Sequence, residues 1–335
     1  MKKRPFVLLL FLSAFVSAPA QKDSIRAHID TAIQILQQHS LYAGRVNWDS
    51  ARAQAYRLSA AATNKEQTFP AIAHVYKQLN DHHGWFEQYN DKLRIPDSTY
   101  PVRLSEGLKD EWAMGPKIKT AMLGRIAYLR MPSMPAYSQK QMDHYANWLL
   151  DSVISLNSRH PEAWIIDLRL NNGGNIVPMM SGFSGFFTDG VISYYLDKNN
   201  KPVSRSVISK GKFIQEDTII ANLKGAIPDL HKVKVAVLIG AGTGSSGEGV
   251  AANFQARKHS RLFGERSAGV ANSTEGFLFN NNNSYFLITT SRLGDRHKEP
   301  LAESVFPDVM VLNNDAYSDL SQDNAVKAAL AWLGK

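Results

Sequence analysis

Two runs of mainly apolar residues constrain the fold of this chain more than any other feature. One run covers residues 163–168 and leads into an Asn-Asn-Gly-Gly segment at 171–174; the other covers 232–239 and leads into Gly-Ala-Gly at 240–242. Strands with apolar residues at consecutive positions, rather than at alternate ones, are buried on both faces, as in sheets covered by helices on both sides. Helices expected at 139–157 and 246–258 alternate with these strands. The pattern therefore predicts a layered α/β fold.

Other segments extend this pattern. Apolar residues recur at helical spacing within 24–86, which predicts a small helical N-terminal region. Prolines punctuate a polar stretch at 89–116, which we interpret as linker and short strands. The remaining expected elements are strands at 125–130, 261–263, 276–279 and 284–290, a turn at Asn280–Asn283, and a helix at 322–333.

The first twenty residues have the features of a secretory signal peptide. Lys2, Lys3 and Arg4 precede an apolar run at 6–16, and Ala18-Pro19-Ala20 offers a small-x-small cleavage site before Gln21. An uncleaved membrane anchor is the alternative. The expected organisation is a signal peptide at 1–20, a helical domain at 21–95 and an α/β domain at 96–335, in a protein that is exported to the periplasm or the extracellular space with no integral membrane segment after cleavage.

The amino-acid composition excludes several kinds of functional site. The chain has no cysteine, which excludes disulfides, thiolate metal sites and a cysteine nucleophile. Its formal net charge is +8, of which three units lie in the expected signal peptide, and the basic residues are scattered. We therefore expect no nucleic-acid partner.

The segment after the second apolar run carries the strongest chemical signal. Residues 243–248 read Thr-Gly-Ser-Ser-Gly-Glu and connect a buried strand to a helix. This geometry would present the Ser245 hydroxyl at a helix N-terminus, where free N–H groups and the helix dipole favour developing negative charge. A serine that merely caps the helix is the alternative.

Two further segments contain candidate functional residues. Gly173 and Gly174 follow a strand, so their N–H groups could help to hold an oxyanion, although a tight strand–helix turn would also need glycine. Asp167 and Arg169 lie in an apolar run, so each should need a partner. His82 and His83 follow an expected helix, where one could act as a general base, although such a pair is more often structural.

Together these segments resemble the tail-specific (C-terminal-processing) protease family, which includes the tricorn core protease. Residues 81–84 (DHHG) resemble the family's Asp-Gly-His-Ser/Thr, residues 167–174 (DLRLNNGG) its Asp-Leu-Arg-x-Asn-x-Gly-Gly, and residues 243–248 (TGSSGE) its Thr-Ala-Ser-Ala-Ser-Glu. The resemblance covers residues 70–335 and implies a crotonase/ClpP-like layered α/β core.

The chain departs from the commoner members of this family in two ways. Only about forty residues separate Phe86 from Arg125, which leaves no room for a PDZ domain. The commoner members have a lysine about twenty-five residues after the serine, where this chain has Val270. The resemblance therefore points to the tricorn-like branch, with a catalytic histidine and glutamate in place of the Ser–Lys dyad.

The resemblance implies a serine peptidase that acts on a peptide or polypeptide without metal or cofactor. Ser245 would be the nucleophile, His83 the base and Glu303 the acidic member, with Glu299 as second choice. The N–H of Ser246 and that of Gly173 or Gly174 would hold the oxyanion. Glu248 could contribute, but a cap of the following helix is favoured.

Two other functions stay open at this point. Retinoid-binding relatives use the same fold, so the chain could be a non-catalytic ligand- or peptide-binding protein. Crotonase enzymes also share the fold, but their acyl-CoA chemistry relies on paired carboxylates and needs no serine at a glycine turn. The oligomeric state is not indicated by the sequence.

Overall fold

The computed structural model describes residues 17–100 and 103–334, which form two units. The first unit contains the chain up to Ile95 and the later segment Glu275–Ile288, and the second contains the remainder. Residues 1–16 of the expected signal peptide lie outside the described residues. Among the helices described, none is both long enough and apolar enough to cross a membrane.

The first unit combines three helices with a small antiparallel sheet. Strand β1 pairs with β2 and with the first residues of β12, which forms a hairpin with β11 through the turn at Asn280–Asn283. Phe86 of β1 packs against Phe286 of β12, with ring centroids 4.8 Å apart, in the core beneath the helices. The elements are α1 (Ser17–His39), α2 (Trp48–Leu58), α3 (Phe69–Leu79), β1 (Trp85–Gln88), β2 (Asp91–Leu93), β11 (Ser273–Phe279) and β12 (Ser284–Gly294).

The prediction that residues 24–86 are helical is wrong after Leu79. Helix α3 ends because Asn80 adopts a left-handed conformation with φ 51°, which terminates a helix. Trp85 and Phe86 begin a strand, consistent with the preference of aromatic residues for strands.

The second unit is built on a six-stranded sheet in the order β13-β10-β9-β5-β4-β3. All neighbours are parallel except β3 and β4. The expected buried runs form its central strands. The strands are β3 (Lys119–Leu123), β4 (Ile126–Arg130), β5 (Ala163–Asp167), β9 (Lys234–Ile239), β10 (Ser260–Gly264) and β13 (Val309–Met310).

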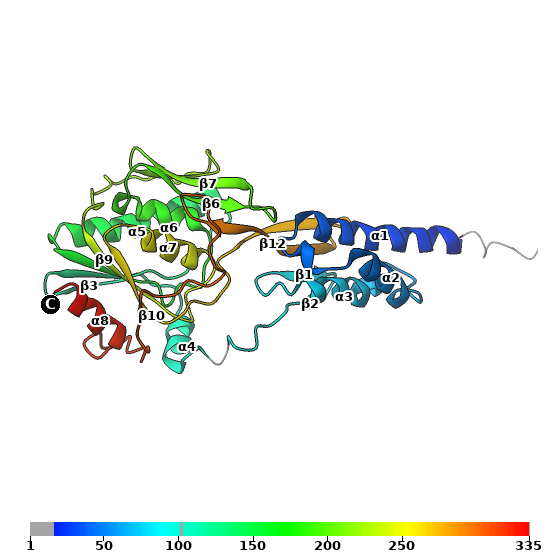
Figure 1. The fold of residues 1–335 in the computed structure, drawn as a ribbon, viewed down its shortest axis with the longest axis horizontal. Helices are drawn as coiled ribbons and strands as arrows, with labels where there is room; N and C mark the ends of the chain where they lie inside the picture. The colour runs from blue at the N-terminus through cyan, green and yellow to red at the C-terminus, as the bar shows by residue number, and fades with distance from the viewer. Residues whose placement is uncertain (1–16, 101–102, 335) are drawn as a thin grey trace, which may run out of the picture. The chain divides into compact units, whose positions relative to one another are not determined.

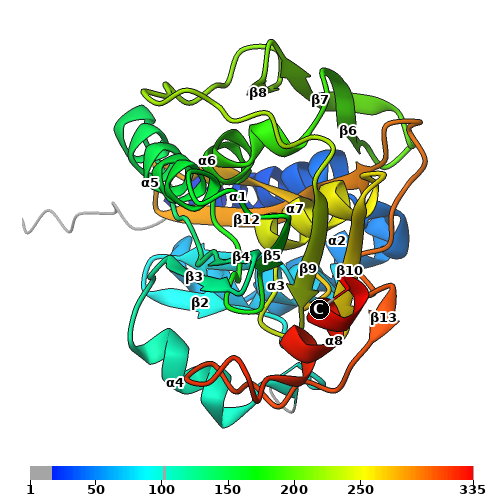
Figure 2. The same cartoon turned by 90° about the vertical axis from the view of Figure 1, so that its left-hand side faces the viewer.

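Helices cover both faces of this sheet. Helices α5 (Gln139–Asn157), α6 (Ile176–Gly182) and α7 (Ser246–Gln255) pack on one face (Figure 1). Helix α8 (Asn324–Trp332) packs on the other, against β9 and β10 (Figure 2). Along β9, Val235 and Val237 join the first core and Ala236 and Leu238 the second. This burial on both faces explains why the strand is apolar at every position after the exposed Lys234.

Several elements of the second unit were not expected from the sequence. Strands β6 (Gly190–Leu196), β7 (Pro202–Ser209) and β8 (Lys212–Gln215) pair with one another, and β6 also pairs with the end of β12. The interpretation of 89–116 as linker and short strands is wrong where helix α4 (Glu106–Ala113) forms. Its first turn is capped by Ser105, whose hydroxyl accepts the N–H of Leu108 at 3.1 Å.

Candidate active site

The candidate site lies where three parallel strands end. Arg130, the last residue of β4, is opposite Asp167, the last residue of β5, and Asp167 is opposite Leu238 of β9. The loops that follow these strands therefore leave the sheet at the same edge. Ligand sites of open α/β sheets lie outside the carboxyl ends of the strands.

Ser245 occupies a strained position between β9 and α7. Its backbone has φ 53° and ψ −122°, a conformation that non-glycine residues rarely adopt. Such strain costs about 1–3 kcal/mol and concentrates at functional sites. The residue directly precedes a ten-residue helix, whose N-terminal N–H groups and dipole favour negative charge. The local geometry is a sharp strand-to-helix turn with the serine at its tip, which resembles the turn that holds the nucleophile of α/β-hydrolases.

Hydrogen bonds tie this loop to the loop after β5. The N–H of Gly244 donates to the carbonyl of Asn171 at 2.9 Å, and the Thr243 hydroxyl donates to the carbonyl of Leu168 at 3.0 Å. Asn171 is fully buried and its side-chain amide donates to the carbonyl of Pro132, in the loop after β4. The three loops are therefore held in one connected arrangement.

Gly173 and Gly174, in the loop after β5, have backbone conformations that favour glycine. Their φ angles are +115° and +126°. A Cβ on Gly173 would lie 2.6 Å from the Ser245 Cβ, and one on Gly174 would lie 2.4 Å from the carbonyl oxygen of Met134. Only glycine permits both the conformation and the close approach to Ser245.

The two glycines differ in the use of their N–H groups. The N–H of Gly173 donates to the side-chain oxygen of Asn171 at 3.0 Å. Among the hydrogen bonds of the described residues, none has the N–H of Gly174 or of Ser246 as its donor. The Ser246 hydroxyl donates to the carbonyl of Gly174 at 2.9 Å, which links the two residues. Two backbone donors beside the serine are thus left for a ligand.

A buried ionic network supports the loop after β5. The Arg169 guanidinium donates to Asp167 through Nε at 3.0 Å and Nη2 at 2.7 Å, and to Asp323 through Nη1 at 2.8 Å. Tyr128 donates to Asp167 at 2.7 Å. The prediction that Asp167 and Arg169 need partners is confirmed, because they bind each other. The carboxylate of Asp323 also caps α8.

Glu248 is buried directly beneath the serine loop. Its carboxylate accepts the N–H of Ser245 at 2.8 Å, those of Gly269 and Val270 at 2.8 and 2.9 Å, and the Ser267 hydroxyl. Burial raises its pKa to about 7, against the opposing effect of these donors. The capping arrangement favoured from the sequence is present, and the carboxylate also binds a second loop. The signal for it in the sequence was the place of Glu248 in the first turn of the helix, where a carboxylate interacts favourably with the helix dipole.

Glu303 lies in a segment that is connected to this second loop. The N–H of Ala271 donates to the Glu303 carbonyl at 3.0 Å, and the N–H of Val305 donates to the Ser267 hydroxyl at 2.7 Å. The Glu303 side chain is exposed, and that of Glu299 is also exposed. Ser267, which bridges Glu248 and this segment, was not singled out in the sequence.

His83 belongs to the first unit, where a buried aspartate shapes its turn. The Asp81 carboxylate accepts the N–H of His83 at 3.1 Å and that of Gly84 at 3.2 Å. A Cβ on Gly84 would lie 2.2 Å from the carbonyl oxygen of Leu287. His82 is exposed, and its Nδ1 lies 3.3 Å from the carbonyl oxygen of Ile95. The two histidines therefore differ in environment.

A serine on a strained strand–turn–helix connection, flanked by unused backbone N–H donors, is the arrangement that serine hydrolases of α/β fold use for acyl transfer. The chain belongs to Peptidase family S41, whose model matches residues 125–311, more than half of its length. This is a family of serine peptidases.

Beyond the family model, the chain is also similar to individual proteins, one by sequence and two by fold. A nisin-resistance protein from Lactococcus lactis subsp. lactis is 25% identical over 315 residues, which cover 92% of this chain and 87% of that protein. A lipoprotein from Streptococcus agalactiae superposes with a TM-score of 0.66 at 17% identity, over 92% of this chain and 96% of that one. The photosystem II D1 C-terminal processing protease superposes with a TM-score of 0.59 at 13% identity, over 91% and 97%.

Proposed function

We propose that this chain is an exported serine peptidase that hydrolyses peptide bonds through an acyl-enzyme on Ser245. The single observation that carries the proposal is the strained backbone of Ser245 against Gly173, beside the unused N–H groups of Gly174 and Ser246. A serine that only capped a helix would not need this conformation. Membership of family S41 supports the same chemistry.

In the proposed reaction, the Ser245 hydroxyl attacks the scissile carbonyl while His83 takes its proton. The new C–O bond places negative charge on the carbonyl oxygen, which the N–H groups of Gly174 and Ser246 stabilise. We favour Gly174 over Gly173 because the Gly173 N–H already donates to Asn171. Collapse of the intermediate breaks the C–N bond, and His83 returns the proton to the leaving amine. Water then releases the acyl group by the same steps.

Glu303 is proposed as the acidic member that orients or polarises the base. Val270 stands where a Ser–Lys enzyme would have its lysine, so we place the chain in the tricorn-like branch. The second unit would form the crotonase/ClpP-like peptidase domain expected at 96–335, and the first unit, which is helical up to Leu79, would contain the N-terminal domain expected at 21–95.

Export is proposed from the signal-like residues 1–20. A relative named for nisin resistance and a structural neighbour described as a lipoprotein support a location in the cell envelope or outside the cell. Mass spectrometry of the N-terminus of exported protein should find Gln21. An intact Met1 on membrane-bound protein would contradict the proposal.

Labelling with a fluorophosphonate tests the nucleophile directly. Purified protein should gain one adduct, located on Ser245 by peptide mass spectrometry, and should hydrolyse an unstructured peptide. Ser245→Ala should lose both properties and keep its melting temperature, whereas Ser246→Ala should retain substantial activity because its backbone N–H survives. Absence of labelling and hydrolysis in the wild-type protein would favour a non-catalytic peptide-binding protein.

A further inference from the structure

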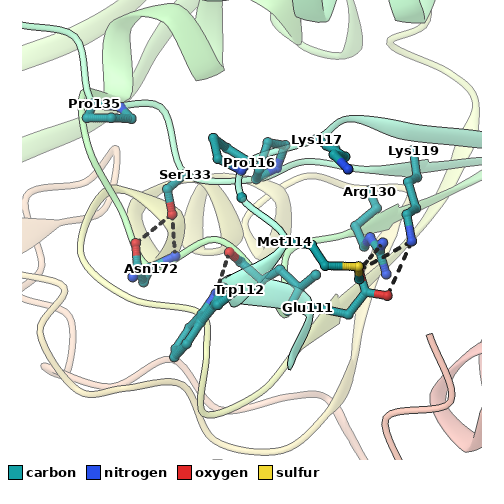
Figure 3. Close-up of a pocket in the computed structure, with 13 residues that line it drawn as sticks. Glu111, Trp112, Met114, Pro116, Lys117, Lys119, Arg130, Ser133, Pro135 and Asn172 are labelled. Carbon is teal, nitrogen blue, oxygen red and sulfur yellow. Dashed lines mark hydrogen bonds and ion pairs between the residues drawn. The ribbon is translucent and has the colours of Figure 1, made fainter. Parts of the chain in front are cut away.

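A cavity of about 400 Å³ lies in the second unit next to the loop that contains Gly173 (Figure 3). Asn172, which precedes Gly173, lines it, and the N–H of Asn172 donates to the Ser133 hydroxyl at 3.0 Å. Trp112 of α4 also lines it and donates to the carbonyl of Leu170 at 3.0 Å. A Cβ on Gly242, in the loop that leads to the serine, would lie 3.1 Å from Trp112. The cavity therefore adjoins both loops of the candidate active site.

The cavity contains an excess of positive charge. Lys117, Lys119 and Arg130 line it, against the single carboxylate of Glu111. Lys119 and Arg130 lie directly opposite each other on the antiparallel strands β3 and β4, a placement in which like charges repel. Glu111 binds both, at 3.2 Å from the Lys119 ammonium and 2.7 Å from Arg130 Nη2 (Figure 3). One carboxylate thus pairs with two of the three cations but neutralises only one positive charge, so these four side chains have a net charge of +2.

Arg130 retains unused donors although it is buried. Its side chain is only 2% exposed, and among the described residues its Nε and Nη1 have no hydrogen-bond partner. A buried donor without an acceptor is costly, and more so when it is charged. Arginine is the residue best suited to bind carboxylates, since all five of its N–H groups donate. The guanidinium also lies over the Tyr317 ring, 5.1 Å from its centroid, but this contact supplies no hydrogen-bond acceptor. A ligand carboxylate that reached this side chain would supply one.

The rest of the cavity wall is largely apolar. Met114 is 54% exposed, and the apolar side chains of Trp112, Leu170 and Pro135 also line the cavity. Such a wall suits the carbon atoms of a peptide, whereas an inorganic anion would gain nothing from it.

We propose that this cavity is a subsite that binds a carboxylate of the peptide substrate, with Arg130 and Lys117 as its cationic partners. The inference rests on the proposed peptidase function. The carboxylate belongs either to an acidic side chain close to the scissile bond or to the C-terminus of the peptide. The subsite would make the protein selective for acidic peptides or for chain ends.

Binding to the Ser245→Ala variant tests the subsite without catalysis. Fluorescence polarisation would compare dye-labelled alanine-rich peptides that carry Glu or Gln at each position in turn, each as free acid and as C-terminal amide. A preference for Glu over Gln identifies a side chain, and a preference for the acid over the amide identifies the chain end. Equal affinity for all of these peptides would overturn the proposal.

Substitutions in the cavity then test which side chains cause the preference for an acidic peptide. In the Ser245→Ala background, Arg130→Met should reduce affinity for the preferred acidic peptide by about 10-fold or more, as expected when a charged hydrogen bond is lost. Lys117→Met should reduce it by roughly 2- to 5-fold, as expected for an exposed ion pair. Lys140→Met, at an exposed lysine of α5 outside the cavity, should leave it unchanged.

Two controls distinguish a folding defect from a loss of carboxylate binding, and the subsite from the peptidase function. If Arg130→Met does not fold, Lys117→Met decides, and an unchanged acidic preference in that variant would overturn the proposal. An unchanged preference in a folded Arg130→Met protein would do the same. Hydrolysis of the uncharged parent peptide by protein with Ser245 intact tests the peptidase function separately. Acid-selective binding without any hydrolysis would retain the subsite and refute the peptidase.

Discussion

At the scale of single residues, the strained backbone of Ser245 depends on the absence of a side chain at Gly173. The two residues come from loops that follow different strands, and the space between them is smaller than one methyl group requires. Strain at one position is maintained because the surrounding hydrogen bonds determine the path of the loop.

Gly173→Ala should therefore abolish fluorophosphonate labelling and peptide hydrolysis. Its Cβ would meet the Ser245 Cβ at 2.6 Å and displace the serine, and the positive φ would add strain of about 1–3 kcal/mol. Gly190→Ala is the matched control, because Gly190 has φ +135° and open space around the added Cβ. Both variants should be destabilised, but only Gly173→Ala should be inactive. Normal turnover of Gly173→Ala would remove this residue from the site.

Glu248 predicts a pH-dependent contribution to stability. Its pKa is raised from 4.5 to about 7 in the folded state, so the folded protein holds a proton that the unfolded chain has released between these values. Its contribution to the free energy of unfolding should fall as pH rises from about 4.5 to about 7, by ~3 kcal/mol in all. Urea unfolding of wild type and Glu248→Gln should show a stability difference that changes by this amount between pH 4.5 and pH 8. Glu106→Gln, at an exposed glutamate of α4, should show no such change; a constant difference for Glu248→Gln would contradict the assignment.

At the scale of elements, strands and helices are coupled through buried charges. Asp323 caps α8 through the N–H of Val326 at 3.0 Å and also binds Arg169 in the loop after β5. The helix on one face of the sheet thereby supports the loop that carries Gly173. Such pairing is needed because an isolated buried charge is strongly unfavourable.

Asp323→Ala should destabilise the protein by about 3–5 kcal/mol in urea unfolding, because it leaves Arg169 partly uncompensated. Ser138→Ala, which removes only the cap of α5, should cost about 1 kcal/mol. The difference between the losses in free energy of unfolding of the two variants measures how much Asp323 contributes by compensating the charge of Arg169. Equal effects would show that Asp323 acts as a cap alone.

At the scale of the whole molecule, the proposed catalytic residues are distributed between two units. Ser245 and Glu303 belong to the second unit, and His83 belongs to the first. Strand β12 belongs to both, since its first residues pair with β1 and its last with β6. Peptidase activity would therefore require both parts of the chain.

His83→Ala should lower peptide hydrolysis by several orders of magnitude, because removal of a triad base eliminates proton transfer to and from the serine. His82→Ala is the internal control and should lower it little, since His82 is exposed beside Ile95. Glu303→Gln, assayed alongside, tests the acidic member. Near-normal activity of His83→Ala together with loss of activity in Lys258→Ala would replace the proposed triad with a relocated Ser–Lys pair.

The sequence by itself determined the elements whose patterns have a local cause. Mainly apolar runs predicted β5 and β9, and apolar residues at helical spacing predicted α5 with its observed bounds. The strand–glycine–serine–helix order likewise indicated the turn at Ser245. These features depend on residues that are adjacent in the chain, so that local patterns suffice to predict them.

Only the tertiary structure decided which distant residues surround that turn. The contact of Gly173 with Ser245, the binding of Glu248 to the loop at 267–270 and the unused donors of Arg130 depend on how the strands align at one edge of the sheet. Helix α4 was missed because its stability comes from a single cap and from packing against a loop that follows another strand. Strand register and loop packing are long-range properties, and no local pattern in the chain encodes them.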